Sequence, residues 1–228
     1  MHSTTFLLID AGVPCRNCAD GKRGTEYFGK SPRGPHSLAA VCAPCCCRCC
    51  SPGYMTTLRA FSAFDLLRFN NVNLDPLTET YTVGFYLQYL AKWPDLCYTA
   101  EAPGGRAMGY ILGKSESFRA PDSWHGHVTA VTVPPEYRRL GMATKLMGML
   151  EAGSDRVNCF FVDLFVRQSN GLAIDMYKKM GYSIYRQVIG YYSGEEDAYD
   201  MRKALKADPE RKSVIPLNPL RVHPDDLD

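Results

Sequence analysis

The sequence is poor in the features that mark membrane proteins, secreted proteins and nucleic-acid-binding proteins. No apolar run approaches the ~20 residues that a membrane-crossing helix needs, so we expect no membrane association. The apolar stretch "TTFLLIDAGV" is interrupted by Asp10 and lacks a preceding basic region, which makes it a poor signal peptide. The 26 basic and 24 acidic residues nearly cancel, to a net charge of +2, which argues against a polyanion-binding surface and a direct nucleic-acid partner.

Cysteine is scarce in the apolar, well-patterned part of the chain. Eight of the ten cysteines precede residue 51, and the other two, Cys97 and Cys159, each lie alone in apolar surroundings. Isolated cysteines of this kind usually behave as small core residues. The lack of a disulfide framework is typical of a reducing compartment, so we predict a cytoplasmic location.

The first 54 residues read as a separate extension rich in Cys, Gly and Pro. The pairs Cys15–Cys18 and Cys42–Cys45 have the C-x2-C spacing of a four-thiolate zinc site. The run "CAPCCCRCC", however, allows many pairings, and the segment has no periodic apolar face. We therefore favour a disordered extension and predict no metal site. A zinc module, an organelle transit peptide and translation from Met55 are the alternatives.

From Met55 onward, apolar patterns alternate between strand and helix. The predicted strands are 56–61, the two arms of a hairpin at 96–114, 125–133, 159–166, 183–192 and 198–205. The predicted helices are 63–75, 83–94, the segment that follows Gly141, and 169–182. This order predicts an α/β domain over 55–204, with a mixed sheet of about seven strands and helices on both faces. The polar, Pro-rich tail over 205–228 is expected to be largely loose.

A possible phosphate site follows the predicted strand 125–133, in "VPPEYRRLGMAT". The first turn of a helix exposes unpaired N–H groups and a positive dipole end, which together attract phosphate. Gly141 permits close backbone approach, Arg138 and Arg139 add positive charge, and Thr144 adds a hydroxyl. Small Ala143 leaves room in the next turn. The alternative is an ordinary solvated helix start.

A second strand–helix unit places polar residues at the same edge of the sheet. Asn170 and Tyr177 are seven positions apart, two helical turns, so they share a helix face. Ligands of open α/β sheets bind at such an edge. The alternative for Tyr177 is an amphipathic core tyrosine.

These motifs resemble those of the GNAT acyltransferases. "RRLGMA" matches the R/Q-x-x-G-x-G/A motif of that family, and "NGLAIDMYKKMGY" is similar to its C-terminal segment. "NNVNLDPLTETY", "FYLQYLAKWP", "WHGHVTAVTVPPEYRRLGMA" and "YDMRKAL" further resemble the catalytic subunits of NatB-type N-terminal acetyltransferases. The resemblance runs from about Met55 to the end and implies the GNAT fold. Gly190 departs from the subtype, which usually carries an acidic residue there.

The resemblance implies acetyl-CoA as co-substrate, bound where the fourth and fifth strands splay apart. Its pyrophosphate would lie on the amides after the fourth strand, its pantetheine along that strand, and Asn170 would help to hold it. The implied contacts are Val131, Thr132, Val133, Arg138, Arg139, Leu140, Gly141, Met142, Ala143, Thr144 and Asn170. Tyr177 would protonate the leaving thiolate.

His127 is the best titratable candidate for a catalytic base, because an imidazole changes charge near neutral pH. A peptide α-amine needs little help: its pKa lies near 8, and positioning supplies much of the acceleration. Recognition is an equal alternative. Enzymes of the resembled subtype acetylate Met followed by Asp, Glu, Asn or Gln, and His127 with Thr129 would offer donors to that side chain. His125 faces the same side and is not separated from His127 by this reasoning.

The implied peptide-binding walls carry a carboxylate and three tyrosines. Glu79 and Tyr81 would lie on one wall, binding the α-amine or backbone and the methionine, and Tyr191 and Tyr192 on the other. A surface carboxylate and tyrosines that merely pack a hairpin are the plain alternatives.

The resemblance also implies partners: a nascent-protein N-terminus as substrate, and a large helical-repeat auxiliary subunit that links the enzyme to ribosomes. Apolar Leu66, Phe69 and Leu87 are candidates for that contact, and burial in the core is the alternative. Two rival functions remain open. One is a GNAT reaction on lysine side chains or small amines, and the other is a non-enzymatic chain whose Cys-rich segment binds zinc.

Overall fold

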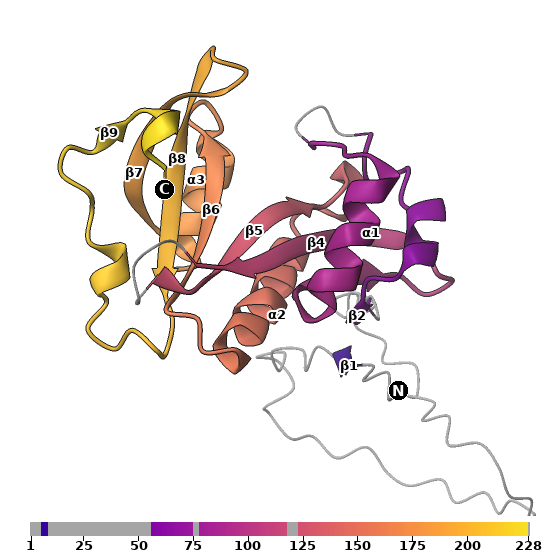
Figure 1. The fold of residues 1–228 in the computed structure, drawn as a ribbon. Coiled ribbons are helices and arrows are strands. Elements are labelled where there is room, and N and C mark those ends of the chain that lie inside the picture. The colour runs from indigo at the N-terminus through magenta and orange to yellow at the C-terminus, as the bar shows by residue number, and fades with distance from the viewer. Residues whose placement is uncertain (1–5, 9–55, 75–77, 118–122, 228) are drawn as a thin grey trace, which may run out of the picture.

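A single sheet of nine strands organises the residues that the computed structural model describes, 6–8, 56–74, 78–117 and 123–227 (Figure 1). The strands are β1 (Phe6–Leu8), β2 (Thr56–Ala60), β3 (Cys97–Glu101), β4 (Ala107–Glu116), β5 (His125–Thr132), β6 (Phe161–Arg167), β7 (Ser183–Tyr192), β8 (Glu196–Ala204) and β9 (Arg221–Val222). The helices are α1 (Val83–Lys92), α2 (Met142–Arg156) and α3 (Gly171–Lys179). Short 3-10 turns cover Ala63–Leu67, Pro94–Leu96, Pro135–Tyr137, Lys212–Val214 and Pro224–Asp226.

The sheet is mixed, in the order β1-β2-β3-β4-β5-β6-β8-β7-β9. Strands β2 to β5 are successive antiparallel neighbours, whereas β5 and β6 run parallel. A parallel pair requires a long crossover, and α2 provides it. Strand β8 returns between β6 and β7, antiparallel to both. The predicted fold class is confirmed, and the seven predicted strands correspond to β2 through β8.

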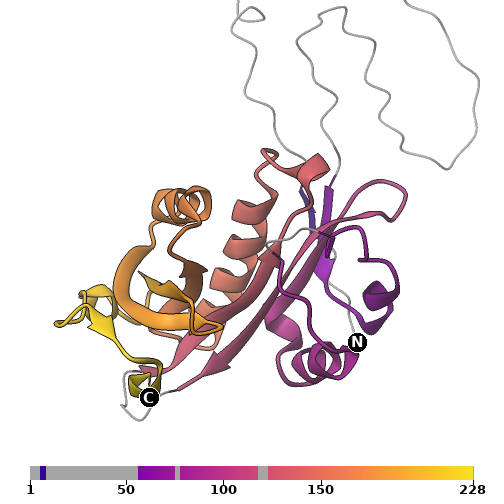
Figure 2. The same cartoon turned by 90° about the horizontal axis from the view of Figure 1, so that it is seen from above.

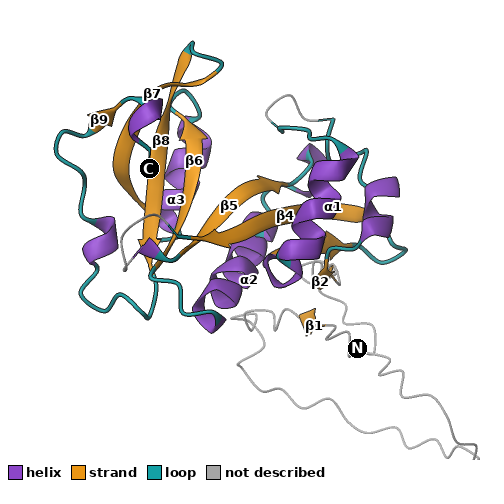
Figure 3. Cartoon of the chain, in the orientation of Figure 1, coloured by secondary structure: helices purple, strands orange, loops and turns teal. Residues whose placement is uncertain are grey.

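Helices cover both faces of the β3–β5 region. Seen from above, α2 and α1 lie on opposite sides of β4 and β5 (Figure 2), and Figure 3 shows the same layers by type of structure. Strand β4 serves both layers, because Met108 and Ile111 join one buried cluster while Tyr110 and Leu112 join the other. Burial on both faces explains why this strand reads as a continuous apolar run.

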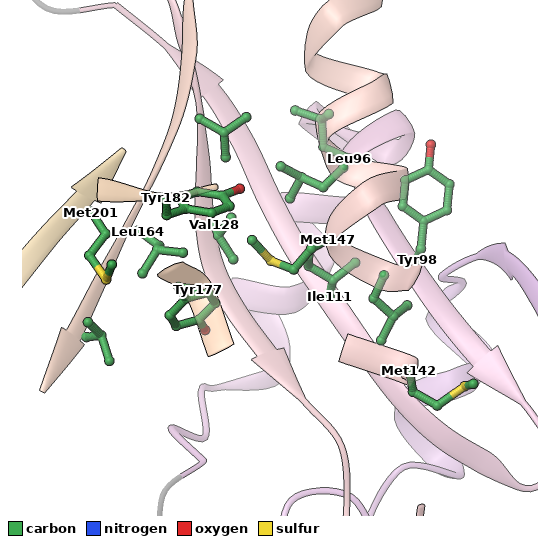
Figure 4. Close-up of a cluster of buried hydrophobic side chains, with 14 of the residues drawn as sticks. Leu96, Tyr98, Ile111, Val128, Met142, Met147, Leu164, Tyr177, Tyr182 and Met201 are labelled. Atoms are coloured by element: carbon green, nitrogen blue, oxygen red, sulfur yellow. The ribbon is translucent and has the colours of Figure 1, made fainter. Parts of the chain in front are cut away.

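The larger cluster joins α2 and α3 to the sheet (Figure 4). Leu146 and Leu150 of α2 are fully buried in it, and each such leucine contributes about 1.5–3 kcal/mol to stability. Two strand glycines let the helix approach closely. A Cβ at Gly113 would collide with the Leu150 side chain, and one at Gly126 with Ser154. These contacts fix the second half of α2 against β4 and the start of β5.

The predicted helix over 63–75 is wrong in extent. Only Ala63–Leu67 is helical, as a 3-10 turn, and turns follow to Leu74. Asp65 accepts two hydrogen bonds from Arg59, at 2.7 Å each, and one from the backbone N–H of Ser62. Phe69 packs edge-on against Tyr86 in the core. These tertiary contacts override the weak helical spacing.

The C-terminal tail is packed on the sheet and is not loose as expected. Val222 of β9 pairs in parallel with Val188 of β7. Asp208 accepts hydrogen bonds from the backbone N–H groups of Lys212 and Ser213, at 3.0 and 2.8 Å. Backbone pairing and carboxylate capping need no apolar period, so the sequence pattern gave no warning of them.

Near the N-terminus, β1 pairs with β2 at the edge of the sheet. Residues 1–5 and 9–55 lie outside the described residues, and with them the predictions of a disordered extension, a zinc module and a transit peptide. Among the described helices, none is long and apolar enough to cross a membrane.

Candidate active site

The two halves of the sheet diverge between β5 and β6. Their parallel pairing ends at Val128 and Leu164. Beyond that point β5 continues along β4 as far as Thr132, while β6 continues along β8 as far as Arg167 (Figure 1). We call this divergence, residues 129–132 of β5 and 165–167 of β6, the seam. Within the described sheet, β5 has a strand partner on only one side there.

A β-bulge opens the seam. Leu112 of β4 pairs with Ala130 and Gly113 with Val128, so Thr129 has no partner on β4. An extra residue of this kind bends its strand and increases the local twist. The Thr129 hydroxyl donates to the hydroxyl of Tyr89 in α1, at 2.9 Å. The bulge thus turns β5 away from β6, and the Thr129 hydrogen bond holds the bent strand against α1.

The loop before α2 lies at the end of the bent strand. Arg139 and Gly141 both have positive φ, 67° and 75°, and a Cβ at Gly141 would meet open space. The amides of Met142, Ala143 and Thr144 form the first turn of α2, where N–H groups have no partner within the helix. The side chains of Arg139, Leu140 and Thr144 are exposed, whereas that of Met142 is buried in the core.

Two cofactor candidates also make contacts within the protein. The Nε of Arg138 donates to the carbonyl of Val133 at 3.0 Å, which fastens the loop to the chain just after β5. The Thr132 hydroxyl, buried, lies 2.7 Å from that of Thr78. Val131 and Val133 pack beside the larger core cluster, which leaves their backbone as the polar part.

The second strand–helix unit brings Asn170 and Tyr177 to the same region. Asn170 is the N-cap of α3, and its Oδ1 accepts the N–H of Ala173 at 3.2 Å. Tyr177 is 7% exposed and packs edge-on against Tyr182 (Figure 4). Burial raises the pKa of Tyr177 to about 12, so this phenol keeps its proton at neutral pH.

His127 is held by a residue that the sequence reasoning did not single out. Its Nδ1 lies 2.8 Å from Oδ1 of Asp163 on β6. The structure also separates the two histidines. His125 is fully buried, with its Nδ1 2.6 Å from the carbonyl of Ser123, whereas the His127 side chain is 15% exposed. Of the pair, only His127 is placed to meet a ligand.

The β7–β8 hairpin forms one wall beside the seam. Tyr191 stacks on Phe165, with ring centroids 4.6 Å apart and planes within 7°. Tyr192 packs edge-on against Tyr191 and donates to the Phe165 carbonyl at 3.3 Å. Gly190 precedes them with φ +61°, in a stretch where the pairing of β7 with β8 shifts register.

The facing wall is the segment before α1. Tyr81 stacks on Phe85, with centroids 4.3 Å apart. Burial raises the pKa of Tyr81 to about 12, and the charges of Glu79 and Tyr191 add to the shift, so both groups lie within electrostatic range. Glu79 pairs with Arg167 at 3.1 Å. The guanidinium of Arg167 also lies 4.0 Å above the ring of Tyr192, so it bridges the two walls.

Comparisons with known proteins show the family to which the chain belongs. Residues 64–182 match the model of the Acetyltransferase (GNAT) family. The chain is 61% identical over 175 residues to the "N-terminal acetyltransferase B complex catalytic subunit NAA20" of Arabidopsis thaliana, which covers 76% of this chain and 99% of the relative. The chain belongs to the family of NatB catalytic subunits. It is therefore an acyltransferase of the GNAT class, acting in N-terminal acetylation with acetyl-CoA as co-substrate.

Solved structures of NatB proteins share the fold. The structure of Chaetomium thermophilum Naa20 in complex with a bisubstrate analogue has a TM-score of 0.69 and 46% identity, over 74% of this chain and 97% of that one. A NatB acetyltransferase complex bound to CoA and MES has a TM-score of 0.60 and 46% identity, over 65% and 98%. The first 54 residues lie outside the GNAT match.

Three residues beside the seam were not singled out from the sequence: Asp163, Phe165 and Arg167. All three lie on β6, within "FFVDLFVR". The sequence signal for this group was Asp163, the one charged residue inside the apolar stretch "FFVDLFV". A buried carboxylate needs a partner, so it indicates a polar contact at this point of the strand. The pairing itself depends on the register of His127 with Asp163, which only the fold reveals.

Proposed function

We propose that this NatB-type subunit acetylates the α-amine of nascent chains that begin Met-Asp, Met-Glu, Met-Asn or Met-Gln. The observation that carries the proposal is the seam. It brings the end of β5, the start of α2, Tyr177, His127 and two tyrosine-bearing walls to one place. An extended peptide and an extended pantetheine would meet there from opposite sides.

The residues around the seam fit acetyl-CoA. Free backbone edges bind extended ligands as an added strand would, and Val131, Thr132 and Val133 offer such an edge. The first-turn amides of α2 suit the pyrophosphate, and the open space at Gly141 lets it approach. Exposed Arg139 supplies positive charge beside them. The Oδ1 of Asn170 accepts the N–H of Ala173 at the helix cap, so its side-chain amide nitrogen is the group that would contact a ligand.

Acetyl-CoA supplies the activated acetyl thioester that the substrate amine attacks. Tyr177 is assigned to the leaving sulfur. With a pKa of about 12 against roughly 8.5 for an ordinary thiol, the phenol would not transfer its proton outright. It acts instead as a hydrogen-bond donor that stabilises developing negative charge.

His127 has two possible duties, general base and reader of the second side chain. The contact with Asp163 places a proton on Nδ1 and leaves Nε2 for the ligand. A neutral Nε2 accepts a proton, whereas a protonated one donates to an Asp, Glu, Asn or Gln side chain. Thr129 supplies a second polar group on the same strand. We assign base catalysis to neutral His127 and contact with the second side chain to Thr129 on the same strand. Reading of that side chain by protonated His127 is the alternative.

The walls are assigned to the rest of the peptide. Tyr191 and Tyr192 are assigned to the peptide backbone, and Tyr81 to the methionine side chain. Glu79 is assigned to the α-amine. Because Glu79 pairs with Arg167, an incoming ammonium would compete for a carboxylate that already has a cation beside it.

The α1 side of the fold exposes apolar side chains. Phe64, Leu67, Val83 and Leu87 expose between 43% and 80% of their surface there. Of the residues the sequence suggested for this contact, Phe69 belongs to the core, Leu66 packs beside it and Leu87 is exposed. NatB relatives form a complex, and we propose that a large helical-repeat auxiliary subunit covers this face, joins the enzyme to ribosomes and keeps it in the cytoplasm.

The full chain, co-expressed with a candidate auxiliary subunit, is assayed on peptides that start Met-Asp, Met-Glu, Met-Asn, Met-Leu and Ser-Glu, with an internal-lysine control. We expect kcat/KM for the first three to exceed the others by roughly tenfold or more, because polar groups of the site go unpaired with the wrong side chain. Activity on lysine, the rival function, or equal activity on Met-Leu would overturn the substrate assignment.

A further inference from the structure

A row of buried charged groups crosses the C-terminal half of the sheet and ends at His127. Asp163 on β6 is 2% exposed and lies directly opposite His127 on β5 and Arg202 on β8. Arg202 is 6% exposed and pairs with Asp200 at 3.2 Å, and Arg186 of β7 pairs with the same carboxylate at 2.9 Å. The row thus runs through four neighbouring strands.

We propose that Asp163 is the positioning residue of His127, and its ladder partner on the other side is Arg202. This inference rests on the proposed function, because it assigns a task to the histidine that faces the substrate. Asp163 fixes the proton on Nδ1 of His127 and sets the tilt of the ring. Only Nε2 then remains for the peptide.

The backbone register brings His127 and Asp163 together. His127 and Asp163 are direct partners in the parallel ladder, so their side chains leave the sheet side by side. The distance between Nδ1 and Oδ1 is 2.8 Å, that of a charge-assisted hydrogen bond. The second oxygen of Asp163 lies 3.8 Å from Nε2 of the buried His125.

The surroundings keep the carboxylate charged. Burial alone would raise the pKa of Asp163, but His127, His125 and Arg202 together hold it below its ordinary value. Arg202 cannot drift away, because its guanidinium lies 3.5 Å from the ring centre of Tyr185 and 4.5 Å from that of Phe161.

Other titratable groups face this row from neighbouring elements. Lys114 of β4 is the direct ladder partner of His127 and pairs with Glu116 at 2.5 Å, and Glu116 also lies 3.8 Å from Nε2 of His125. Tyr191 of β7 has a raised pKa, first through burial and then through the charge of Asp163. Asp200 is compensated by its two arginines. Asp163 is the one carboxylate that contacts His127 among the described residues.

The imidazole tautomer of the full chain in complex with its auxiliary subunit tests the inference without any assay of activity. Long-range 1H–15N NMR of His127 should show the proton of the neutral ring on Nδ1, and Asp163→Asn should abolish that preference. A proton on Nε2 in the wild type, or an unchanged pattern in the variant, would overturn the inference. The spectrum stands even if the peptide panel refutes the proposed substrates.

Kinetics then separate positioning from mere stability. His127→Asn keeps a donor for Asp163 but removes Nε2, so the fold should survive. We expect Asp163→Asn and His127→Asn each to lower kcat/KM on a Met-Asp peptide by roughly 10–100-fold. Their combination should be no slower than His127→Asn alone, because Asp163 acts only through the ring. Losses that multiply, or none in Asp163→Asn, would contradict the proposal.

The pH profile provides a readout that a structural role would not move. Removing the negative charge of Asp163 disfavours the protonated imidazole, so the inflection due to His127 should shift to lower pH in Asp163→Asn. It should vanish in His127→Asn. Glu151→Gln is the matched control, since it removes a carboxylate of α2 that pairs with Lys203 and makes no contact with His127, and it should leave the inflection in place.

Discussion

The two halves of the sheet differ in the kind of side chain that they bury. In the N-terminal half, from β2 to β5, helices and short turns bury both faces, and apart from the pairs of Arg59 with Asp65 and Glu101 the contacts are mostly apolar and aromatic. In the C-terminal half, from β6 to β9, one face joins the apolar cluster of α2 and α3. The other carries Asp163, Arg202, Asp200 and Arg186 in a buried row. The N-terminal half is held mainly by apolar packing, whereas the C-terminal half carries a row of buried charged side chains.

The site lies where these halves part. The apolar half contributes the bent strand, the start of α2 and the bulge at Thr129. The polar half contributes Asp163, Arg167 and the tyrosines of the hairpin. A reaction that handles an amine, a thiolate and a polar side chain needs oriented charges, and these keep their orientation only against a fixed frame. Three predictions separate the two contributions.

The largest effect is expected from a cavity in the apolar half. Leu150→Ala removes a fully buried side chain that fills the space left by Gly113. The free energy of unfolding should fall by about 2–5 kcal/mol, because the cavity adds to the lost burial. Thermal or chemical unfolding measures it. Leu172→Ala is the matched control on α3, where the side chain is 87% exposed, and it should change stability by less than about 0.5 kcal/mol.

The next effect belongs to catalysis and should spare stability. Tyr177→Phe removes one hydroxyl from a buried ring and keeps its packing against Tyr182. We expect kcat to fall by roughly 100-fold, near the lower end for a group that assists proton or charge movement. KM and the melting temperature should stay close to those of the wild type. Tyr98→Phe, whose hydroxyl donates to the Asp95 carbonyl at 2.7 Å, is the control and should keep its activity. An unchanged kcat in Tyr177→Phe would remove this residue from the mechanism.

The sequence predicted the strands and helices of both halves better than the charged contacts between strands, for a physical reason. Periodicity reports burial against a single face, so strands β2 to β8 and helices α1 to α3 could be predicted, as could the loop at Gly141. It says nothing about which charged groups meet across strands. Asp163 and Arg202 are 39 positions apart in the sequence, yet they are direct partners in the ladder. The predicted helix over 63–75 was wrong for the same reason. Asp65 bonds to Arg59 and Phe69 packs on Tyr86, and periodicity reports neither contact.

The smallest effect concerns the two glycines of the β7–β8 hairpin that flank Tyr191 and Tyr192. Gly190 and Gly194 both have positive φ, 61° and 76°, which costs any other residue roughly 1 kcal/mol. Their surroundings differ. A Cβ at Gly190 would lie 3.1 Å from the carbonyl oxygen of Gly194, whereas one at Gly194 would meet open space. Gly190→Ala should therefore lose more stability than Gly194→Ala, and it should also raise KM for the peptide, because crowding at this bulge tilts Tyr191 away from Phe165. Calorimetry and peptide kinetics on the two variants make the comparison. Equal losses in both would mean that backbone conformation alone governs this turn, and that the departure from an acidic residue at position 190 has no bearing on the wall.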